Sequence, residues 1–228
     1  MKAGAVTENI TQLTRFGAVN AHLVAEDDGY TLVDTMVKGS HGKLLEAAAA
    51  LDAPIVRLLL THAHDDHVGS LEALARALPE AAVLASSRDA KLILGSKEPE
   101  PGEPKGRLLG SYPPVDVTFQ RELADGDRVG SLQVIATPGH SPGHISLLDT
   151  RENALLAGDA FSGIGGVATT AGPYWRFPLP GLVTWHRPTA LASAAKLADL
   201  KPDWLLFGHG KPVKDPGPEM QKAVERSS

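Results

Sequence analysis

Short β-branched runs and longer alanine- and leucine-rich runs alternate along the first half of the chain. Turn residues separate them, most clearly the acidic turn that ends at Gly29. Strands are predicted at residues 6–10, 19–24, 30–34, 55–60 and 82–85, and helices at residues 43–51, 68–78 and 88–94. The run at residues 55–60 is continuously apolar, which is typical of a strand covered on both faces. Strands and helices in alternation predict a layered α/β fold.

The second half repeats the order of strands followed by a helix. Residues 95–114 contain five prolines and four glycines, so we expect a long surface loop rather than a regular element. Further strands are predicted at residues 115–119, 128–129, 132–136, 144–148, 154–157 and 204–207, and a helix at residues 188–200. We interpret residues 1–228 as one domain built from two strand-then-helix halves, roughly 1–114 and 115–228.

Composition and charge narrow the class of protein. A chain of 228 residues with 43% hydrophobic content can bury a sizeable core. The net charge of -5 provides no basic surface for a phosphate backbone, so we expect no nucleic-acid partner. No apolar run reaches the roughly 18 residues that a spanning helix needs, and the N-terminus has no signal pattern, so we expect a cytoplasmic protein without a membrane partner. The absence of cysteine excludes disulfides and thiolate ligands.

Candidate chemistry begins directly after the apolar run. Residues 61–67 read Thr-His-Ala-His-Asp-Asp-His, which places His62, His64 and His67 beside Asp65 and Asp66. So many titratable groups are costly to bury unless a cation holds them. A metal site is therefore the interpretation that this stretch favours.

Three more polar clusters follow predicted strands. They are Pro-Gly-His-Ser-Pro-Gly-His at residues 138–144, the pair Gly158-Asp159, and Gly-His-Gly at residues 208–210. Glycine beside a potential ligand lets the backbone turn sharply and approach an ion closely. These clusters add His140, His144, Asp159 and His209 to the candidate residues.

With these four motifs in this order, the chain resembles the metallo-β-lactamase fold superfamily over nearly its whole length. The resemblance implies a four-layer αββα sandwich, in which two mixed β-sheets are flanked by helices. It also implies two divalent metal ions. His62, His64 and His140 would hold the first, Asp66, His67 and His209 the second, and Asp159 would bridge them. Imidazole and carboxylate ligands suit zinc first, with manganese or iron as alternatives.

A binuclear site of this kind favours hydrolysis. A metal-bridging hydroxide would attack an acyl carbon while Asp66, the candidate catalytic residue, accepts its proton. The resemblance implies that Asp34 orients a ligand histidine, and we expect His144 to support the site rather than to bind metal. Asp65 is interpreted as a solvated carboxylate at a helix N-terminus. His22, His41 and His186 each stand alone and are interpreted as ordinary histidines.

Comparison with branches of the superfamily favours a small acyl substrate. Glyoxalase II and the quorum-quenching lactonases share the four motifs, but each branch matches only in part. The ending after Gly210 is short for glyoxalase II, and Ser162 stands where the lactonases carry a tyrosine. We therefore predict cleavage of an ester, thioester or lactone. A mononuclear iron enzyme similar to persulfide dioxygenases, and a phosphodiesterase, stay open as alternatives.

The aromatic residues between residues 161 and 185 suggest where a substrate would lie. We predict a pocket lined by Phe161, Tyr174, Trp175, Arg176 and Phe177. The same segment is also typical of a protein contact, because tryptophan, tyrosine and arginine are enriched at interfaces. A homodimer contact through this segment is the alternative.

Overall fold

The computed structural model describes residues 1–228, which divide into two compact units. Unit 1 contains Met1–Ser96 and Ser111–Leu123, and unit 2 contains Lys97–Gly110 and Ala124–Ser228. The long proline-rich loop is thus divided between the units. The prediction that both halves form a single domain stays a prediction. No helix is long and apolar enough to cross a membrane.

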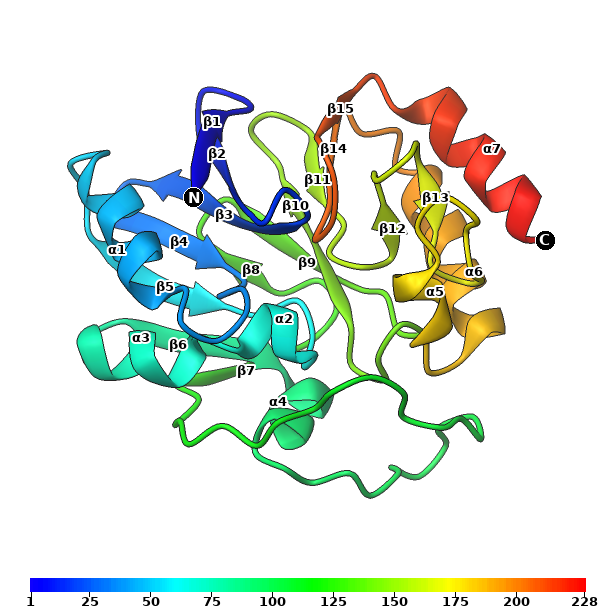
Figure 1. Ribbon diagram of the computed structural model, residues 1–228, viewed down its shortest axis with the longest axis horizontal. Coiled ribbons are helices and arrows are strands. Elements are labelled where there is room, and N and C mark those ends of the chain that lie inside the picture. Colours follow the sequence, from blue (N-terminus) through cyan, green and yellow to red (C-terminus); the bar gives the residue numbers. More distant parts are fainter. The chain divides into compact units, whose positions relative to one another are not determined.

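Unit 1 is built on a seven-stranded mixed sheet in which sequence order and spatial order agree (Figure 1). Its strands are β1 (Lys2–Ala5), β2 (Ile10–Arg15), β3 (Val19–Glu26), β4 (Gly29–Val33), β5 (Ile55–Leu59), β6 (Ala82–Ser86) and β7 (Arg121–Leu123). The first four strands pair antiparallel, and β4 to β7 pair parallel. Parallel neighbours need crossover connections, and the three connections between β4 and β7 all contain helix.

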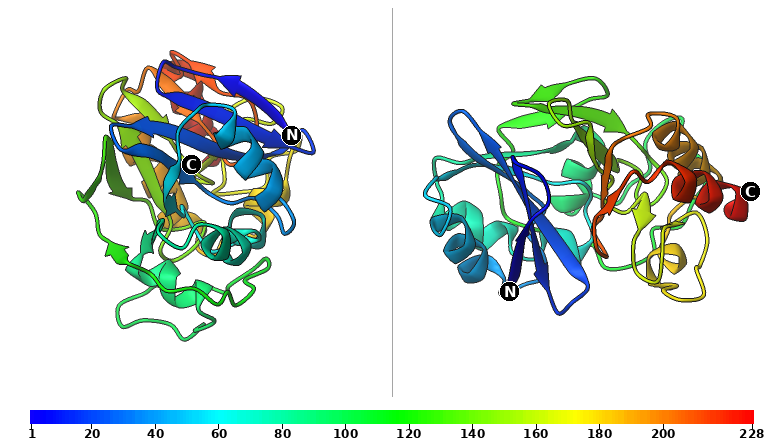
Figure 2. Two further views of the ribbon diagram at one scale, coloured as in Figure 1. Left: turned by 90° about the vertical axis from the view of Figure 1, so that its left-hand side faces the viewer. Right: turned by 90° about the horizontal axis from the view of Figure 1, so that it is seen from above.

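The helices of unit 1 are α1 (His41–Ala49), α2 (Asp65–Val68), α3 (Leu71–Ala77) and α4 (Ser87–Ile93). Helices α1 and α3 contact each other, and α4 packs against β6 and β7 (Figures 1 and 2). Helix α4 begins where the Ser86 hydroxyl accepts a hydrogen bond from the Asp89 backbone N–H at 3.1 Å. Helix α2 begins at Asp65, inside the histidine-rich stretch.

Unit 2 is built on a six-stranded sheet in the order β15-β14-β11-β10-β9-β8. Its strands are β8 (Arg128–Val129), β9 (Leu132–Ala136), β10 (Ile145–Asp149), β11 (Ala154–Leu156), β14 (Trp204–Leu206) and β15 (Val213–Lys214), and a separate pair is formed by β12 (Phe161–Ser162) and β13 (Ala168–Thr169). Only β11 and β14 pair parallel. The helices are α5 (Leu179–Leu182), α6 (Arg187–Ala198) and α7 (Gly217–Ser227).

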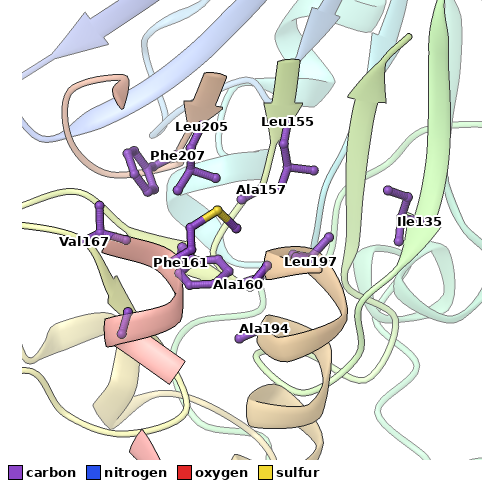
Figure 3. Close-up of a cluster of buried hydrophobic side chains, with 13 residues drawn as sticks. Ile135, Leu155, Ala157, Ala160, Phe161, Val167, Ala194, Leu197, Leu205 and Phe207 are labelled. Atoms are coloured by element: carbon purple, nitrogen blue, oxygen red, sulfur yellow. The ribbon is translucent and has the colours of Figure 1, made fainter. Parts of the chain in front are cut away.

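Helices α6 and α7 contact each other and cover the sheet of unit 2 through one apolar cluster (Figure 3). Leu155 and Leu205 come from the strands, and Ala194 and Leu197 come from α6. The alanine-rich face of α6 lets the helix approach the strands closely. Phe161 is fully buried in this cluster, so it is a core residue and does not line a pocket as predicted.

Two predicted strands are wrong, and two helices, α5 and α7, were not predicted. Of residues 6–10, only Ile10 belongs to a strand, because the Val6 N–H bonds back to the Ile10 carbonyl at 2.8 Å and closes a turn. Residues 115–119 are irregular, and hydrogen bonding to β6 begins only at the Gln120 N–H, just before β7. Helix α7 was overlooked, although Met220 and Ala223 have the three-residue spacing of a buried helix face.

Candidate metal centre

Three buried histidines gather in unit 1 at the carboxyl end of β5. The imidazole centroid of His62 lies 4.9 Å from that of His64 and 4.0 Å from that of His67. All three side chains are buried. The Asp66 carboxylate, which is partly exposed, lies 3.9 Å from His67 Nε2. Residues 62–67 thus bring imidazole and carboxylate donors together, as the motif predicted for metal ligands.

Asp34 connects this cluster to the end of β4. Its Oδ2 lies 2.8 Å from His67 Nδ1, and its Oδ1 accepts a hydrogen bond of 2.8 Å from the Thr61 backbone N–H. A carboxylate at Nδ1 holds a proton there and leaves Nε2 as the nitrogen that can bind a metal. Asp34 has a φ of 64°, a conformation that aspartate tolerates better than most residues.

Sequence reasoning assigned no role to three residues that contact His62, Ala63 or His64. The Thr61 hydroxyl lies 3.0 Å from His62 Nδ1. Asp89 accepts a hydrogen bond of 2.9 Å from the Ala63 backbone N–H. The ring of Tyr112 lies 4.5 Å from that of His64, and burial raises the pKa of its hydroxyl, which therefore stays protonated. Asp89 and Tyr112 carry no sequence signal, because both are remote from the motifs in the chain.

The second set of donors lies in unit 2. His140 Nε2 is 3.6 Å and His209 Nε2 is 3.2 Å from Asp159 Oδ2, and all three residues are buried. His140 follows β9, Asp159 follows β11 and His209 follows β14. The pairing pattern makes these three strands run in one direction, so their carboxyl ends meet at the same edge of the sheet. The topology of unit 2 therefore explains why residues so far apart in sequence converge.

His144 contacts the backbone of Asp159. Its Nδ1 lies 2.8 Å from the Thr137 hydroxyl, and its Nε2 accepts a hydrogen bond of 3.0 Å from the Asp159 backbone N–H. With both ring nitrogens in these contacts, His144 supports the aspartate rather than offering a metal ligand. The supporting role expected for His144 stays a prediction.

Close backbone approaches hold the loops of unit 2 in place. Gly139 has a φ of 136°, and a Cβ there would lie 2.2 Å from the Ala190 backbone N. The Gly208 N–H bonds to the Gly158 carbonyl at 3.0 Å and ties two of the glycine-flanked loops together. His140 Nδ1 lies 3.1 Å from the Thr184 hydroxyl, which sequence reasoning did not identify.

The remaining candidates belong to neither set of donors. Asp65 is exposed, and His41 is exposed at the start of α1. His22 is buried, with its Nε2 3.3 Å from Gln12, and burial lowers the pKa of His22 to about 4. His186 caps α6 by accepting from the Thr189 N–H.

The predicted substrate residues separate into two groups. Tyr174, Trp175 and Arg176 line a pocket of about 880 Å³ within unit 2. Phe177 is not part of that lining, and its ring contacts His209 at 5.6 Å.

Both sets of donors fit a metal ion. They consist of imidazole nitrogens and carboxylate oxygens, which suit zinc, manganese or iron. Asp34 and His144 each contact a candidate ligand in the way that supporting residues of metal sites do. Residues 14–209 match the family described as the metallo-beta-lactamase superfamily. The chain belongs to this superfamily. The predicted metallo-β-lactamase fold, with mixed sheets flanked by helices, is confirmed by similar solved structures.

Related sequences match this chain over different shares of its length. YobT of Bacillus subtilis, described as uncharacterized, is 41% identical over 96% of both chains. YflN of the same organism, described as a probable metallo-hydrolase, is 29% identical over 84% of this chain and 79% of its own length. The hydroxyacylglutathione hydrolase of Aeromonas salmonicida is 34% identical over 55% of this chain, and the match spans only 41% of that enzyme.

Two solved structures illustrate the likeness in fold. TTHA1623, solved in a di-iron-bound form, is 28% identical, with a TM-score of 0.68 over 90% of this chain and 94% of its own. A metallo-β-lactamase from Cronobacter sakazakii is 21% identical, with a TM-score of 0.72 over 100% of this chain and 91% of its own. The second likeness shows the fold alone.

Proposed function

We propose that this protein is a metal-dependent hydrolase that cleaves an ester, thioester or lactone bond of a small molecule. The observation that carries the proposal is the presence of two buried sets of imidazole and carboxylate donors, one in each unit, in a chain of this superfamily. In the arrangement that the superfamily resemblance implies, His62, His64 and His140 hold one ion. Asp66, His67 and His209 would hold the other, and Asp159 would be shared.

Two divalent ions, when bound by these residues, would supply a water of lowered pKa and a Lewis acid for the substrate carbonyl. Residues of the chain orient the donors and accept or hold protons. Asp34 keeps the proton of His67 on Nδ1, and His144 holds the Asp159 backbone in place. Asp66 is the partly exposed carboxylate of the set, so it can accept a proton from the nucleophile and release it to solvent.

The likeness to hydroxyacylglutathione hydrolases supports a thioester substrate. Because the match spans less than half the length of those enzymes, the leaving group is proposed only as a class. The lactone alternative is supported by the phrase Pro-Gly-His-Ser-Pro-Gly-His at residues 138–144, which the quorum-quenching lactonases share. At residue 162, where those enzymes carry a tyrosine, this chain has a buried serine whose hydroxyl lies 3.4 Å from the His209 carbonyl.

We propose that each chain binds two ions and that the preferred metal is zinc. Iron is the alternative, which the di-iron form of TTHA1623 supports. Elemental analysis of the purified protein separates these metals. A single iron per chain together with oxygen consumption would contradict the hydrolase and favour the dioxygenase alternative.

The decisive experiment measures hydrolysis of a lactone, a glutathione thioester and an aryl phosphodiester by metal-loaded protein. We expect turnover of the lactone or the thioester, and loss of this activity in Asp66→Ala. The matched control is Asp65→Ala, which removes the neighbouring exposed carboxylate and should leave the rate unchanged. Cleavage of the phosphodiester alone would overturn acyl hydrolysis as the function.

A further inference from the structure

The pocket of about 880 Å³ in unit 2 has a strongly positive lining. Arg176, Arg187 and Arg226 all line it, and no aspartate or glutamate does. None of the candidate ligands His140, Asp159 and His209 belongs to the lining, so the pocket is separate from the donor set of unit 2. Its volume lies in the range of ordinary small-molecule sites.

Two of these arginine side chains are held in place by contacts with uncharged groups. Arg176 donates to the Gly165 carbonyl at 2.8 Å, and Arg226 donates to the Val167 carbonyl at 2.6 Å. Their guanidinium groups also lie over the rings of Trp175 and Tyr174, at 4.8 Å and 5.4 Å. Carbonyls and rings orient a guanidinium but do not neutralise it. The positive charge is therefore left for an external anion.

Arg187 is placed where it does not serve the stability of its own helix. It is the first residue of α6, and the first turn of this helix contains no acidic side chain. A cation at a helix N-terminus is opposed by the helix dipole. Its side chain is exposed at the rim of the pocket. An anionic ligand would turn this unfavourable placement into a favourable one.

The aromatic side of the pocket favours a ligand with a flat ring. Trp175 lines the pocket and is 78% exposed, which is unusual for so large an apolar side chain. The Tyr174 hydroxyl donates to the Gly165 carbonyl at 3.1 Å, the same carbonyl that receives Arg176. This shared acceptor holds the aromatic and cationic side chains in one arrangement.

From these contacts we infer that the pocket binds a small molecule that carries a phosphate or carboxylate group beside a flat ring. The guanidinium groups take the oxyanion, which arginine binds through paired hydrogen bonds, and Trp175 contacts the ring. The binding site does not depend on the proposed hydrolysis. The pocket and the donor set are nevertheless linked through one segment. Thr170, which lies between the lining residues Thr169 and Ala171, donates a hydrogen bond of 2.6 Å to the Asp159 carbonyl.

The test is a calorimetric titration of the metal-loaded protein with phenyl phosphate and with benzoate, which share the ring and differ in the oxyanion. We expect at least one of them to bind, and we expect added salt to weaken the binding. Arg187→Gln should weaken it about tenfold, the loss expected for a charged hydrogen bond. Arg187 is exposed, so this variant should fold as the wild type does.

Lys222→Gln is the matched control, because it removes an exposed positive charge from α7 without touching the lining. We expect it to bind both probes as the wild type does. Trp175→Ala should reduce the preference for phenyl phosphate over inorganic phosphate. Oxyanions also bind divalent ions, so equal binding by wild type, Arg187→Gln and Arg226→Gln would assign the probe to the metals and overturn the pocket. Failure of both probes to bind would overturn it as well.

Discussion

At the scale of single residues, the surroundings of each side chain separate the candidate ligand histidines from the other histidines. Nine histidines occur in the chain. His62 and His67 are buried against other imidazoles, whereas His186 caps a helix. The sequence distinguished these classes because the candidate ligands stand in motifs with aspartate or glycine neighbours. It could not identify Tyr112, since nothing local to that residue indicates the contact with His64.

Asp34 is expected to matter for metal binding rather than for folding. Asparagine tolerates the same backbone conformation, but its amide N–H cannot accept the proton of His67 Nδ1. We expect Asp34→Asn to weaken metal binding about 10- to 100-fold, measured by competition with a chromogenic chelator. Asp27→Asn, at an exposed turn position, is the control and should bind metal normally. Unchanged affinity in Asp34→Asn would show that the contact does not orient a ligand.

We predict that the stability of the protein depends on pH through Asp149, which is not one of the donor residues. Burial acts to raise the pKa of Asp149, but hydrogen bonds from Arg151 and Ser131 outweigh it and hold this pKa below its ordinary value. A carboxylate with a depressed pKa stabilises the folded state above its unfolded pKa of about 4, and this contribution is lost as the pH falls through the folded value.

The measurement is urea unfolding of wild type and Asp149→Asn at pH 7 and at about pH 3. We expect the variant to lose about 1–2 kcal/mol at pH 7, and the difference between the proteins to shrink in acid. Asp116→Asn, at an exposed loop position, should match the wild type at both values. An equally large difference at both pH values would rule out the charge of Asp149 as its source.

At the scale of elements, the loops that carry donors depend on close packing against helices. The loop that carries His140 lies against the start of α6, where the Trp185 N–H bonds to the His140 carbonyl at 3.0 Å. A sequence predicts that such a loop follows β9, but it does not say which helix supports the loop. The contact joins residues about 45 positions apart, which local patterns do not encode.

Gly139→Ala tests this packing. A Cβ at residue 139 would overlap the backbone of Ala190 and would also require an unfavourable φ. We expect a loss of about 1–3 kcal/mol in the free energy of unfolding and weaker metal binding, measured by urea unfolding and chelator competition. Gly42→Ala is the control: it lies in α1 with open space around it and should stabilise the protein by up to about 1 kcal/mol. A fully stable Gly139→Ala would contradict the packing argument.

At the scale of the whole molecule, bound metal is expected to contribute to stability. A ligand that binds only the folded chain stabilises it by about 2.7 kcal/mol at a free concentration one hundred times its Kd. We therefore expect a chelator to lower the unfolding temperature and added zinc to restore it, measured by calorimetry.

The control for this prediction is a pair of variants. His41→Ala, which removes an exposed histidine, should respond to the chelator as the wild type does. Asp159→Ala should lose most of the response, because it lacks the carboxylate proposed to be shared by the ions. A chelator response that is the same in both variants would place the stabilising metal elsewhere.

The fold class, the order of most elements and the superfamily could all be predicted from the sequence. Apolar spacing and turn residues are local properties, and four motifs in fixed order are specific even without coordinates. It also identified α6, although it placed the start one residue late. Where it was wrong, as at residues 115–119, the alternation of apolar residues was present but no neighbouring strand paired with it.

The distant residues that support the donors, and the pocket proposed for a second ligand, were found only in the folded chain. The carboxyl ends of β9, β11 and β14 meet because of strand direction, which is set by pairing across the sheet of unit 2. Arg176 and Arg226 line one pocket because helix α7, which carries Arg226, lies beside the loop that carries Arg176. Burial and charge at such places are sums over residues far apart in the chain, so no local pattern contains them.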